Sequence, residues 1–385
     1  MIAKPTDALI VGAGIGGLAA ALALRQAGLS VRVTEQAERL EEVGAGLQLS
    51  PNATRILRTM GLLPALQETA VAPEALEVRD GRSGNIIAEC PYAPAVERYG
   101  APFLVVHRAD LHRVLSDAAH AAGCEILLGT RVEGVEAGAG AAAAVASREG
   151  EPLLLKADFL VGADGVRSAV RTQLGFSATP VFADRVAYRA TIPTLPSPHP
   201  VVRLFLGADA HLVTYPVRGG ASTNVVAVVK ATTPVTRWSE PGETATVHAA
   251  FSGWAAEVRD LLARAESYQC WGLFDLEPLP RWGTGRATLI GDAAHAMLPF
   301  LAQGAAQAIE DAAALASAIG ETLSREDALR AYESTRRPRA ARIQREARGN
   351  GFIYHLAGPA RMARDAVLHL TGNRLIDRYD WIYSA

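Results

Sequence analysis

The chain carries two hydrophobic patterns, and the first occupies its N-terminal part. Residues 8–11 form a short apolar run, and after a glycine cluster residues 18–26 form an alanine- and leucine-rich stretch that ends before Gly28. Beyond it, Val31, Val33 and Glu35 predict a second strand that ends in an acid. The expected unit is therefore two strands joined by a helix.

The second pattern begins near residue 181, where strand-like segments follow one another with proline and glycine turns between them. These segments cover residues 185–192, 201–206, 211–217 and 224–229. They predict a mostly antiparallel sheet. Period-two spacing places His211, Val213 and Tyr215 on one face of the third strand. Residues 243–265 predict one amphipathic helix that covers the sheet.

After residue 270 the first pattern returns. The apolar run 287–290 predicts a buried strand, Gly291-Asp292 breaks it, and a helix is expected after Gly304. Residues 325–348 predict an arginine-dense helix whose charges face solvent. The aromatic tail, residues 372–385, is expected to dock on the body of the protein.

These patterns predict an α/β fold in which a Rossmann-like domain is interleaved with a mostly antiparallel β-sheet domain and followed by C-terminal helices. The limits expected for the first domain are 1–72, 101–178 and 271–350, those for the second are 73–100 and 179–270, and those for the helical tail are 351–385. Residues 72–101 predict a hairpin excursion, and residues 137–146 a surface hairpin tip. Residues 43–48 are too glycine-rich for a stable element, and they either let backbone approach a ligand or merely connect.

Composition narrows the class of protein. The 385 residues are 49% hydrophobic and 20% charged, which is the balance of a globular chain with room for two domains. A net charge of −2 provides no basic excess for nucleic acid. Three scattered cysteines suit a cytoplasmic protein, the nine histidines lack metal-ligand spacing, and no secretion signal or membrane span is expected. A small-molecule partner and a monomer or homodimer are expected.

The glycine cluster at residues 12–17 has the spacing G-x-G-x-x-G. Alone, this spacing fits an ordinary tight turn as well as a phosphate site. Here a predicted strand precedes it and a helix follows, and an acid lies about 20 residues further on, where a carboxylate can bind both hydroxyls of an adenosine ribose. A dinucleotide site is therefore expected at Gly12, Gly14, Ile15, Gly17 and Glu35.

Two later turns also combine an acid with glycines. Asp164 stands between Gly162 and Gly165 after a predicted strand, and Arg167 and Arg171 follow one helical turn apart. This arrangement suits a pyrophosphate contact, although a strand-to-helix turn capped by Asp164 would have the same sequence. At Gly291-Asp292, the dipole of the following helix would favour negative charge on a bound ring.

Arg108 stands at the start of the predicted helix 109–122. Its guanidinium could reach a phosphate, or it could be an exposed side chain that only solvates the helix start.

The three motifs in this order resemble those of the aromatic-ring hydroxylases, the single-component FAD-dependent monooxygenases, and the resemblance covers nearly the whole chain. Within that family the segments most similar to the salicylate hydroxylase branch are GAGLQLSPNA (44–53), HLVTYPV (211–217) and AQGAAQAIEDA (302–312). The resemblance implies bound FAD, with NADH or NADPH as a transient co-substrate and O2 as oxidant. It also implies that a C4a-hydroperoxide of the flavin is attacked by the ring of a small phenolic acid.

The resemblance assigns a role to each motif. Glu35 would bind the adenosine ribose, Arg108 the FAD chain, Asp164 and Arg167 the pyrophosphate region, and Asp292 the ribityl hydroxyls, while the turn 299–305 would face the isoalloxazine ring. The implied cofactor site comprises Gly12, Gly14, Ile15, Gly17, Glu35, Gln48, Arg108, Asp164, Arg167, Gly291, Asp292, Gln303, Gly304 and Ala305. The implied substrate pocket comprises Leu47, His211, Tyr215 and Pro299, and the last three of these are the catalytic candidates.

Departures from the family pattern affect the choice of substrate. The usual Gly-Gln-Gly is Ala302-Gln303-Gly304 here, as is usual in the salicylate hydroxylase branch. The 3-hydroxybenzoate 6-hydroxylases carry a glutamine where this chain has Pro299, and the 6-hydroxynicotinate enzymes a histidine near Leu47. The implied reaction is therefore conversion of salicylate to catechol and CO2, with 3-hydroxybenzoate and 6-hydroxynicotinate as alternative substrates.

His211 is expected to bond to or deprotonate the ring hydroxyl, because an imidazole with a reference pKa of about 6.5 can accept a proton near neutral pH. A core histidine satisfied by a backbone carbonyl is the alternative. At the level of the whole protein, the alternatives are a non-catalytic flavoprotein, an H2O2-forming oxidase and an NAD-linked dehydrogenase. The hypothesis of an NAD-linked dehydrogenase explains the glycine motif and Glu35 but assigns no role to Asp164 and Asp292.

Overall fold

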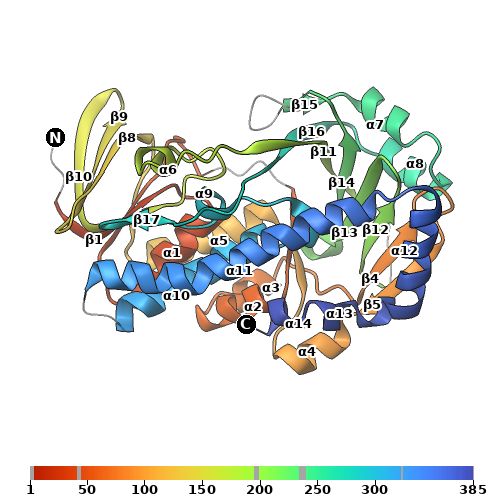
Figure 1. Ribbon diagram of the computed structural model, residues 1–385, viewed down its shortest axis with the longest axis horizontal. Helices are drawn as coiled ribbons and strands as arrows, with labels where there is room; N and C mark the ends of the chain where they lie inside the picture. The colour runs from red at the N-terminus through yellow and green to blue at the C-terminus, as the bar shows by residue number, and fades with distance from the viewer. Residues whose placement is uncertain (1–3, 41–44, 195–198, 234–239, 322–323, 385) are drawn as a thin grey trace.

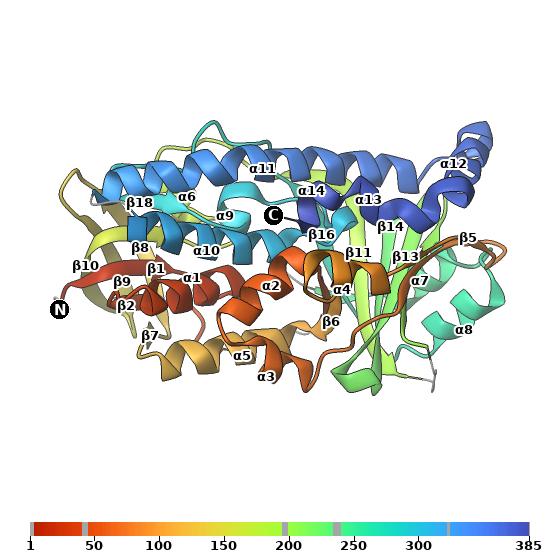
Figure 2. The same cartoon turned by 90° about the horizontal axis from the view of Figure 1, so that it is seen from below.

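Two large β-sheets lie towards opposite ends of the molecule, and the long helix α11 (Arg325–Tyr354) extends from one to the other (Figures 1 and 2). This computed structural model describes residues 4–40, 45–194, 199–233, 240–321 and 324–384. The mixed α/β architecture, with a mostly antiparallel second sheet and C-terminal helices, confirms the predicted fold class.

The first sheet has the strand order β17-β18-β10-β1-β2-β7, and β9 and β8 extend it from β10. Strands β18, β10, β1, β2 and β7 run parallel. The strand bounds are β1 (Thr6–Val11), β2 (Val31–Thr34), β7 (Glu125–Leu127), β8 (Thr130–Ala137), β9 (Ala142–Arg148), β10 (Glu151–Gly162), β17 (Gly283–Thr284) and β18 (Ala287–Leu289). Helices α1 (Ile15–Gln26), α5 (Arg108–Ala121) and α10 (Gly304–Glu321) pack in this layer. Residues 8–11 of β1 are apolar and buried, and Val31 and Val33 of β2 are buried as well, which explains why the sequence pattern predicted these strands.

The second sheet has the order β15-β16-β11-β14-β13-β12-β4-β5 and is antiparallel except where β12 meets β4. The strand bounds are β4 (Ala75–Asp80), β5 (Ile86–Pro91), β11 (Val181–Pro193), β12 (Val201–Leu206), β13 (Ala210–Val217), β14 (Ser222–Lys230), β15 (Glu240–Gly242) and β16 (Tyr268–Asp275). One face, with Leu212 and Ala227, packs under α7 (Thr244–Ala250) and α8 (Ala256–Ala263). The opposite face, with Val213 and Val226, is therefore left to line a site.

Shorter elements connect the two sheets. Strands β3 (Gly46–Leu49) and β6 (Leu104–His107) form a separate antiparallel pair. The remaining elements are α2 (Pro51–Thr59), α3 (Leu63–Gln67), α4 (Ala93–Tyr99), α6 (Ala169–Gln173), η1 (Arg218–Gly220), α9 (Asp292–His295), η2 (Pro299–Leu301), α12 (Gly358–Thr371), η3 (Gly372–Arg374), α13 (Leu375–Arg378) and α14 (Asp380–Tyr383). Strands β4 and β5 belong to the second sheet, although in sequence they lie between β2 and β7 of the first sheet. The domain limits themselves stay predictions.

Several predicted elements were wrong in detail. Residues 46–48 belong to strand β3 rather than to an irregular segment, because β6 supplies a partner, whereas residues 43 and 44 lie outside the described residues. Gly46 is needed there for close packing, since a Cβ at this position would lie 2.4 Å from Cε2 of Tyr215. Strand β9 replaces much of the expected hairpin tip, because its alternate alanines are buried. The hairpin region 72–101 also contains helix α4.

Two predicted helices also differ from the structure. The helix expected over 243–265 is divided into α7 and α8, and Trp254 between them packs over the Cα atoms of Gly81 and Gly207. Helix α11 continues beyond residue 348 to Tyr354, and its arginines do not all face solvent: Arg336 is 3% exposed. The tail docks as expected, since Arg339 donates hydrogen bonds to the carbonyl oxygens of Trp381 and Ile382.

The three cysteines are buried free thiols. Within the described ranges there is no group of histidine, cysteine and acidic side chains that could hold a metal ion. None of the described helices is long and apolar enough to span a membrane.

Candidate active site

A cleft of about 360 Å³ lies between the carboxyl ends of the parallel strands and the inner face of the second sheet. The turns after β1, β10 and β18 form one wall, and β3 and the second sheet form the other. In open parallel sheets ligands bind outside the carboxyl ends of the strands. The motifs that are far apart in the sequence therefore meet at one site.

Two positions of the glycine turn after β1, Gly12 and Gly17, have no room for a side chain. Gly12 has φ +104°, and a Cβ there would lie 2.5 Å from the carbonyl oxygen of Ala163. A Cβ on Gly17 would lie 1.9 Å from the carbonyl oxygen of Gly12, whereas a Cβ on Gly14, the N-cap of α1, would meet no atom within 4 Å. The helix N-terminus, with Gly14 and Ile15, therefore faces open space in the cleft, as an anion site requires.

Glu35 directly follows β2 and is held against this turn. Its Oε2 accepts a hydrogen bond from the N–H of Ala13 at 2.9 Å, and its Oε1 accepts one from Ala37 at 2.9 Å. These bonds orient the carboxylate, and each oxygen retains a lone pair for a ligand hydroxyl. Glu35 lies beside the glycine turn rather than on the wall of the large cleft.

In the turn after β10, the carboxylate of Asp164 bonds to neighbouring residues of the chain. Asp164 accepts hydrogen bonds from Ser168 Oγ at 2.5 Å and from the N–H of Val170 at 3.0 Å, so it holds the start of α6, whose N-cap residue is Ser168. Arg171 is buried and donates to the carbonyl oxygens of Ala293 and Val166, so the expected pairing of Arg167 and Arg171 on a pyrophosphate is wrong. Arg167 does line the cleft, and its guanidinium carbon lies 5.6 Å from the centre of the Phe274 ring.

The third turn places an acid opposite a helix N-terminus. Gly291 has φ +57°, and its N–H donates to Asp311 Oδ2 at 2.8 Å. Asp292 then begins α9 and lines the cleft, and its Oδ1 lies 4.0 Å from the Cβ position of Gly304, where α10 begins. Asp292, Gly304 and Ala305 thus surround one part of the cleft that offers both a carboxylate and backbone N–H groups.

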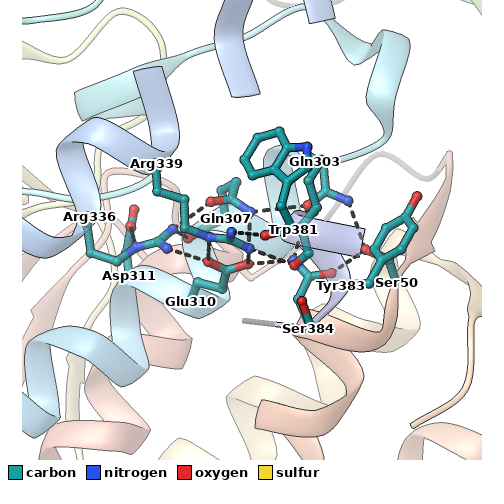
Figure 3. A network of polar contacts seen from close by, with 12 residues as sticks. Ser50, Gln303, Gln307, Glu310, Asp311, Arg336, Arg339, Trp381, Tyr383 and Ser384 are labelled. Atoms are coloured by element: carbon teal, nitrogen blue, oxygen red, sulfur yellow. Dashed lines mark hydrogen bonds and ion pairs between the residues drawn. The ribbon is translucent and has the colours of Figure 1, made fainter. Parts of the chain in front are cut away.

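A buried polar network lies behind this turn (Figure 3). Gln303 is part of it, not of the large cleft: its Nε2 donates to Ser50 Oγ at 2.8 Å, and its Oε1 accepts from Gln307. Glu310 and Asp311 follow on α10, and Arg336 bonds to both of them. Burial alone would raise the pKa of Asp311, but His295 and Arg336 outweigh it and lower the pKa to about 2.

The second sheet presents its predicted polar residues to the site. His211, Val213 and Tyr215 share the inner face of β13 and line the cleft. A second cavity of about 180 Å³ adjoins the cleft, and both are lined by Gln48, His211, Val213, Pro299 and Ala302. Leu47 lines the cleft from β3. The expected catalytic candidates therefore lie around one mainly apolar space.

His211 itself is 2% exposed, and its ring lies 5.3 Å from the Phe300 ring and 5.5 Å from the Tyr354 ring. Burial, followed by His355 and Arg185, holds its pKa well below the usual value. The expectation of a near-reference pKa was wrong, because a buried imidazole without an acid beside it resists protonation. At neutral pH His211 is therefore a neutral hydrogen-bonding group.

Two residues near the site were not singled out by the sequence patterns. Arg189, on β11, lines the cleft with its guanidinium carbon 5.3 Å from the Trp271 ring centre, and its buried Nε has no hydrogen-bond partner among the described residues. Its place on a predicted strand face was the available signal. His355, whose Nε2 lies 3.0 Å from His211 Nδ1, is 144 residues away from it in the chain, so no local pattern could indicate it.

The charges of the described lining residues favour an anionic ligand. Arg108, Arg167 and Arg189 line the cleft, and Asp292 is the acid among them. A flavin dinucleotide fits this arrangement, because it carries a pyrophosphate, ribityl hydroxyls and a flat ring. The cleft offers an open helix N-terminus at Gly14, a carboxylate at Asp292, and a space lined by Leu47 of β3 and Pro299 of η2. A cleft that fits a flavin dinucleotide, beside an apolar cavity with a histidine, is the arrangement expected of a flavoprotein oxidoreductase.

The chain belongs to the FAD-binding domain family, whose family model matches residues 5–347. It is 40% identical over 390 residues to the 3-amino-4-hydroxybenzoate 2-monooxygenase PtmB3 of Streptomyces platensis, which covers 97% of this chain and 94% of the relative. It is 36% identical over 392 residues to the 3-hydroxybenzoate 6-hydroxylase of Polaromonas naphthalenivorans, with 99% and 96% covered. A solved salicylate hydroxylase substrate complex matches with a TM-score of 0.83 and 27% identity, over 99% of this chain and 96% of that one.

These similarities confirm the predicted class. The protein is an FAD-dependent aromatic-ring monooxygenase.

Proposed function

We propose that this enzyme hydroxylates a small phenolic aromatic acid, with bound FAD, NADH or NADPH as reductant and O2 as oxidant. The observation that carries the proposal is the position of His211. It lies where the flavin cleft and the second cavity meet, beside Pro299 and among apolar side chains. A ring placed there can bond its hydroxyl to the imidazole while its carbons face the flavin.

Each part of the site has a task in this proposal. Glu35 binds the adenosine ribose, the α1 N-terminus with Arg108 and Arg167 binds the pyrophosphate, and Asp292 binds the ribityl hydroxyls. Asp164 acts indirectly, because its oxygens hold the start of α6 and with it the turn that carries Arg167.

The roles of the residues around the flavin ring and the substrate are proposed from the same contacts. The backbone at Gly291, Gly304 and Ala305 lies along the isoalloxazine ring of the flavin, and the hydrogen bond of Gln303 to Ser50 supports the start of α10 from the side away from the cleft. Leu47, Gln48, Tyr215 and Pro299 confine the substrate. Burial raises the Tyr215 pKa, so this phenol stays protonated and can donate a hydrogen bond.

Bound FAD supplies electron transfer from the nicotinamide and activation of oxygen. The protein holds the ring in register, excludes water from the cavity and withdraws the hydroxyl proton towards His211. A phenol whose hydroxyl donates to a neutral imidazole is richer in electrons than a free phenol. That property favours attack by the ring on an electrophilic oxygen.

The candidate substrates can be ranked for testing. The relatives named for 3-amino-4-hydroxybenzoate and 3-hydroxybenzoate share 40% and 36% identity, against 27% for the salicylate hydroxylase. These two acids are therefore tested first. Salicylate, implied by Pro299 and by the segments at 211–217 and 302–312, follows, and 6-hydroxynicotinate comes last because of Leu47.

The test combines a substrate panel with one variant. Wild-type enzyme should oxidise NAD(P)H faster with at least one phenolic acid and form hydroxylated product, identified by mass. His211→Ala should still bind FAD and still be reduced, but product per NAD(P)H should fall by roughly 10²–10⁴ with diversion to H2O2. His248→Ala, at an exposed histidine on α7, is the matched control.

Two results would contradict the proposal. If none of the panel stimulates NAD(P)H oxidation, the non-catalytic flavoprotein becomes the better hypothesis. If oxidation is stimulated but yields only H2O2 in the wild type, the protein is an oxidase.

A further inference from the structure

His211 is one end of a chain of two histidines. Its Nδ1 lies 3.0 Å from Nε2 of His355, and His355 Nδ1 lies 2.6 Å from the carbonyl oxygen of Gly351. His355 is the C-cap residue of α11, and Gly351 is in the last turn of that helix. Carbonyls in a last helical turn lack intrahelical partners, so the side chain of His355 satisfies one of them.

The hydrogen-bond directions follow from the end of this chain. A carbonyl oxygen only accepts, so His355 Nδ1 must carry a hydrogen and donate it to Gly351. Burial and Arg185 lower the pKa of His355 to about 4, so the ring is neutral at pH 7 and its Nε2 has no hydrogen. His355 Nε2 is then an acceptor, and His211 Nδ1 must be the donor. The neutral ring of His211 consequently has a lone pair on Nε2.

The surroundings hold both rings in this geometry. Phe300, Tyr354 and His355 contact the His211 ring. Helix α11 approaches Phe300 so closely that a Cβ on Gly351 would lie 2.6 Å from the Phe300 ring. His211 Nε2 has no hydrogen-bond partner among the described residues, and the residue lines both cavities.

We propose that His355 is a positioning residue for the substrate hydroxyl: by accepting the Nδ1–H of His211, it holds His211 in the tautomer whose Nε2 accepts a hydrogen bond from the ring hydroxyl. The inference rests on the proposed function. Without His355, the Nδ1 hydrogen would be unsatisfied in a buried site, and the Nε2–H tautomer, which cannot accept from a phenol, would become favourable. If the phenol proton transfers, its O–H bond breaks, an Nε2–H bond forms, and the resulting imidazolium keeps its Nδ1–H bond to His355.

Three variants test this role. His355→Phe and His355→Leu remove the acceptor, and each should lower product per NAD(P)H by about 10- to 100-fold, by analogy with the loss of partners that orient metal-binding histidines. FAD content and the rate of flavin reduction should stay at wild-type values. His355→Gln offers a carbonyl oxygen to His211 Nδ1 and should restore most of the coupling. His369→Phe, at an exposed histidine on α12, is the control for the loss of an imidazole.

A double-variant cycle separates positioning from a structural effect. If His355 acts through His211, the combined His211→Ala/His355→Phe enzyme should be no worse than His211→Ala alone. Multiplied losses, a Gln variant no better than Phe, or wild-type coupling in both apolar variants would each overturn the inference. Failure of the proposed function is a distinct result, because the wild-type enzyme would then form no hydroxylated product.

Discussion

Replacement of Arg336 by methionine should destabilise the protein strongly, although the residue lies outside the cleft. Its Nε donates to Asp311 Oδ1 at 2.7 Å, it pairs with Glu310, and its Nη2 donates to the Oε1 of Gln307 at 2.7 Å. Methionine has a similar length and fills the space, but it satisfies none of these acceptors. Breaking one partner of a buried ion pair costs about 3–5 kcal/mol, because a buried charge is left uncompensated.

The remaining contacts set where in this range the loss should fall. Glu310 keeps Arg339 at 2.7 Å and Asn52 at 2.5 Å, so its charge stays paired. Asp311 keeps the hydrogen bond to His295 at 2.6 Å but loses its permanent cation. One carboxylate rather than two becomes uncompensated, which places the expected loss near the lower end, about 3 kcal/mol.

The neighbouring Arg337 provides a matched control on the same helix. Its side chain is 40% exposed, and its Nε lies 3.8 Å from Glu333 Oε1. Arg337→Met should therefore cost no more than about 1 kcal/mol. The free energy of unfolding of both variants would be measured by urea titration at pH 7, followed by circular dichroism. The m-value, the dependence of that free energy on urea concentration, would be compared between the two proteins. A loss for Arg336→Met within 1 kcal/mol of that for Arg337→Met would refute the assignment of an essential buried charge network.

The other predictions concern the cofactor and acid. Asp292→Ala should weaken FAD binding roughly 10- to 150-fold, since each charge-assisted hydrogen bond to a ribityl hydroxyl contributes about 1.5–3 kcal/mol. The control is Asp260→Ala, at an exposed aspartate on α8. If both variants retain the same amount of flavin after dialysis, Asp292 does not bind the ribityl hydroxyls. Glu35→Ala should also weaken FAD binding but leave turnover intact at saturating FAD, and a large loss of turnover there would move Glu35 out of the adenosine site. The free energy of unfolding should fall as pH is lowered from about 6.5 to 4. Burial and Arg185 lower the pKa of His355 to about 4 in the folded protein, so in this pH range the unfolded chain binds more protons than the folded protein does. If urea titrations of His355→Gln show the same change of unfolding free energy with pH as the wild type, His355 does not cause the loss.

The sequence predicted best where local pattern and local chemistry agree. The strand–glycine–helix unit at 6–26 and the strands of the second sheet appear nearly as expected, because their hydrophobic periods are read over a few neighbouring residues. Prediction from the sequence was less reliable where a run of alanines hides the alternation of buried and exposed positions, as in β9. It was also less reliable where pairing with a distant strand decides the structure, as for β3. The sequence also predicted that Arg336 faces solvent. That prediction was wrong because the acidic partners of Arg336 come from another helix and are not visible in the local pattern.

What the sequence alone determined is the class of enzyme and the three glycine-containing turns that meet at the cleft. Glycines at positions where a Cβ would strike backbone, such as Gly12 and Gly17, leave few alternatives in any fold that contains them. Tertiary structure alone decided which polar groups are buried together and in which protonation state. The low pKa of His211 and its bond to His355 depend on a sheet face and a helix end that approach only in the folded protein, because hydrogen bonds and desolvation act over a few ångströms and are independent of separation along the chain.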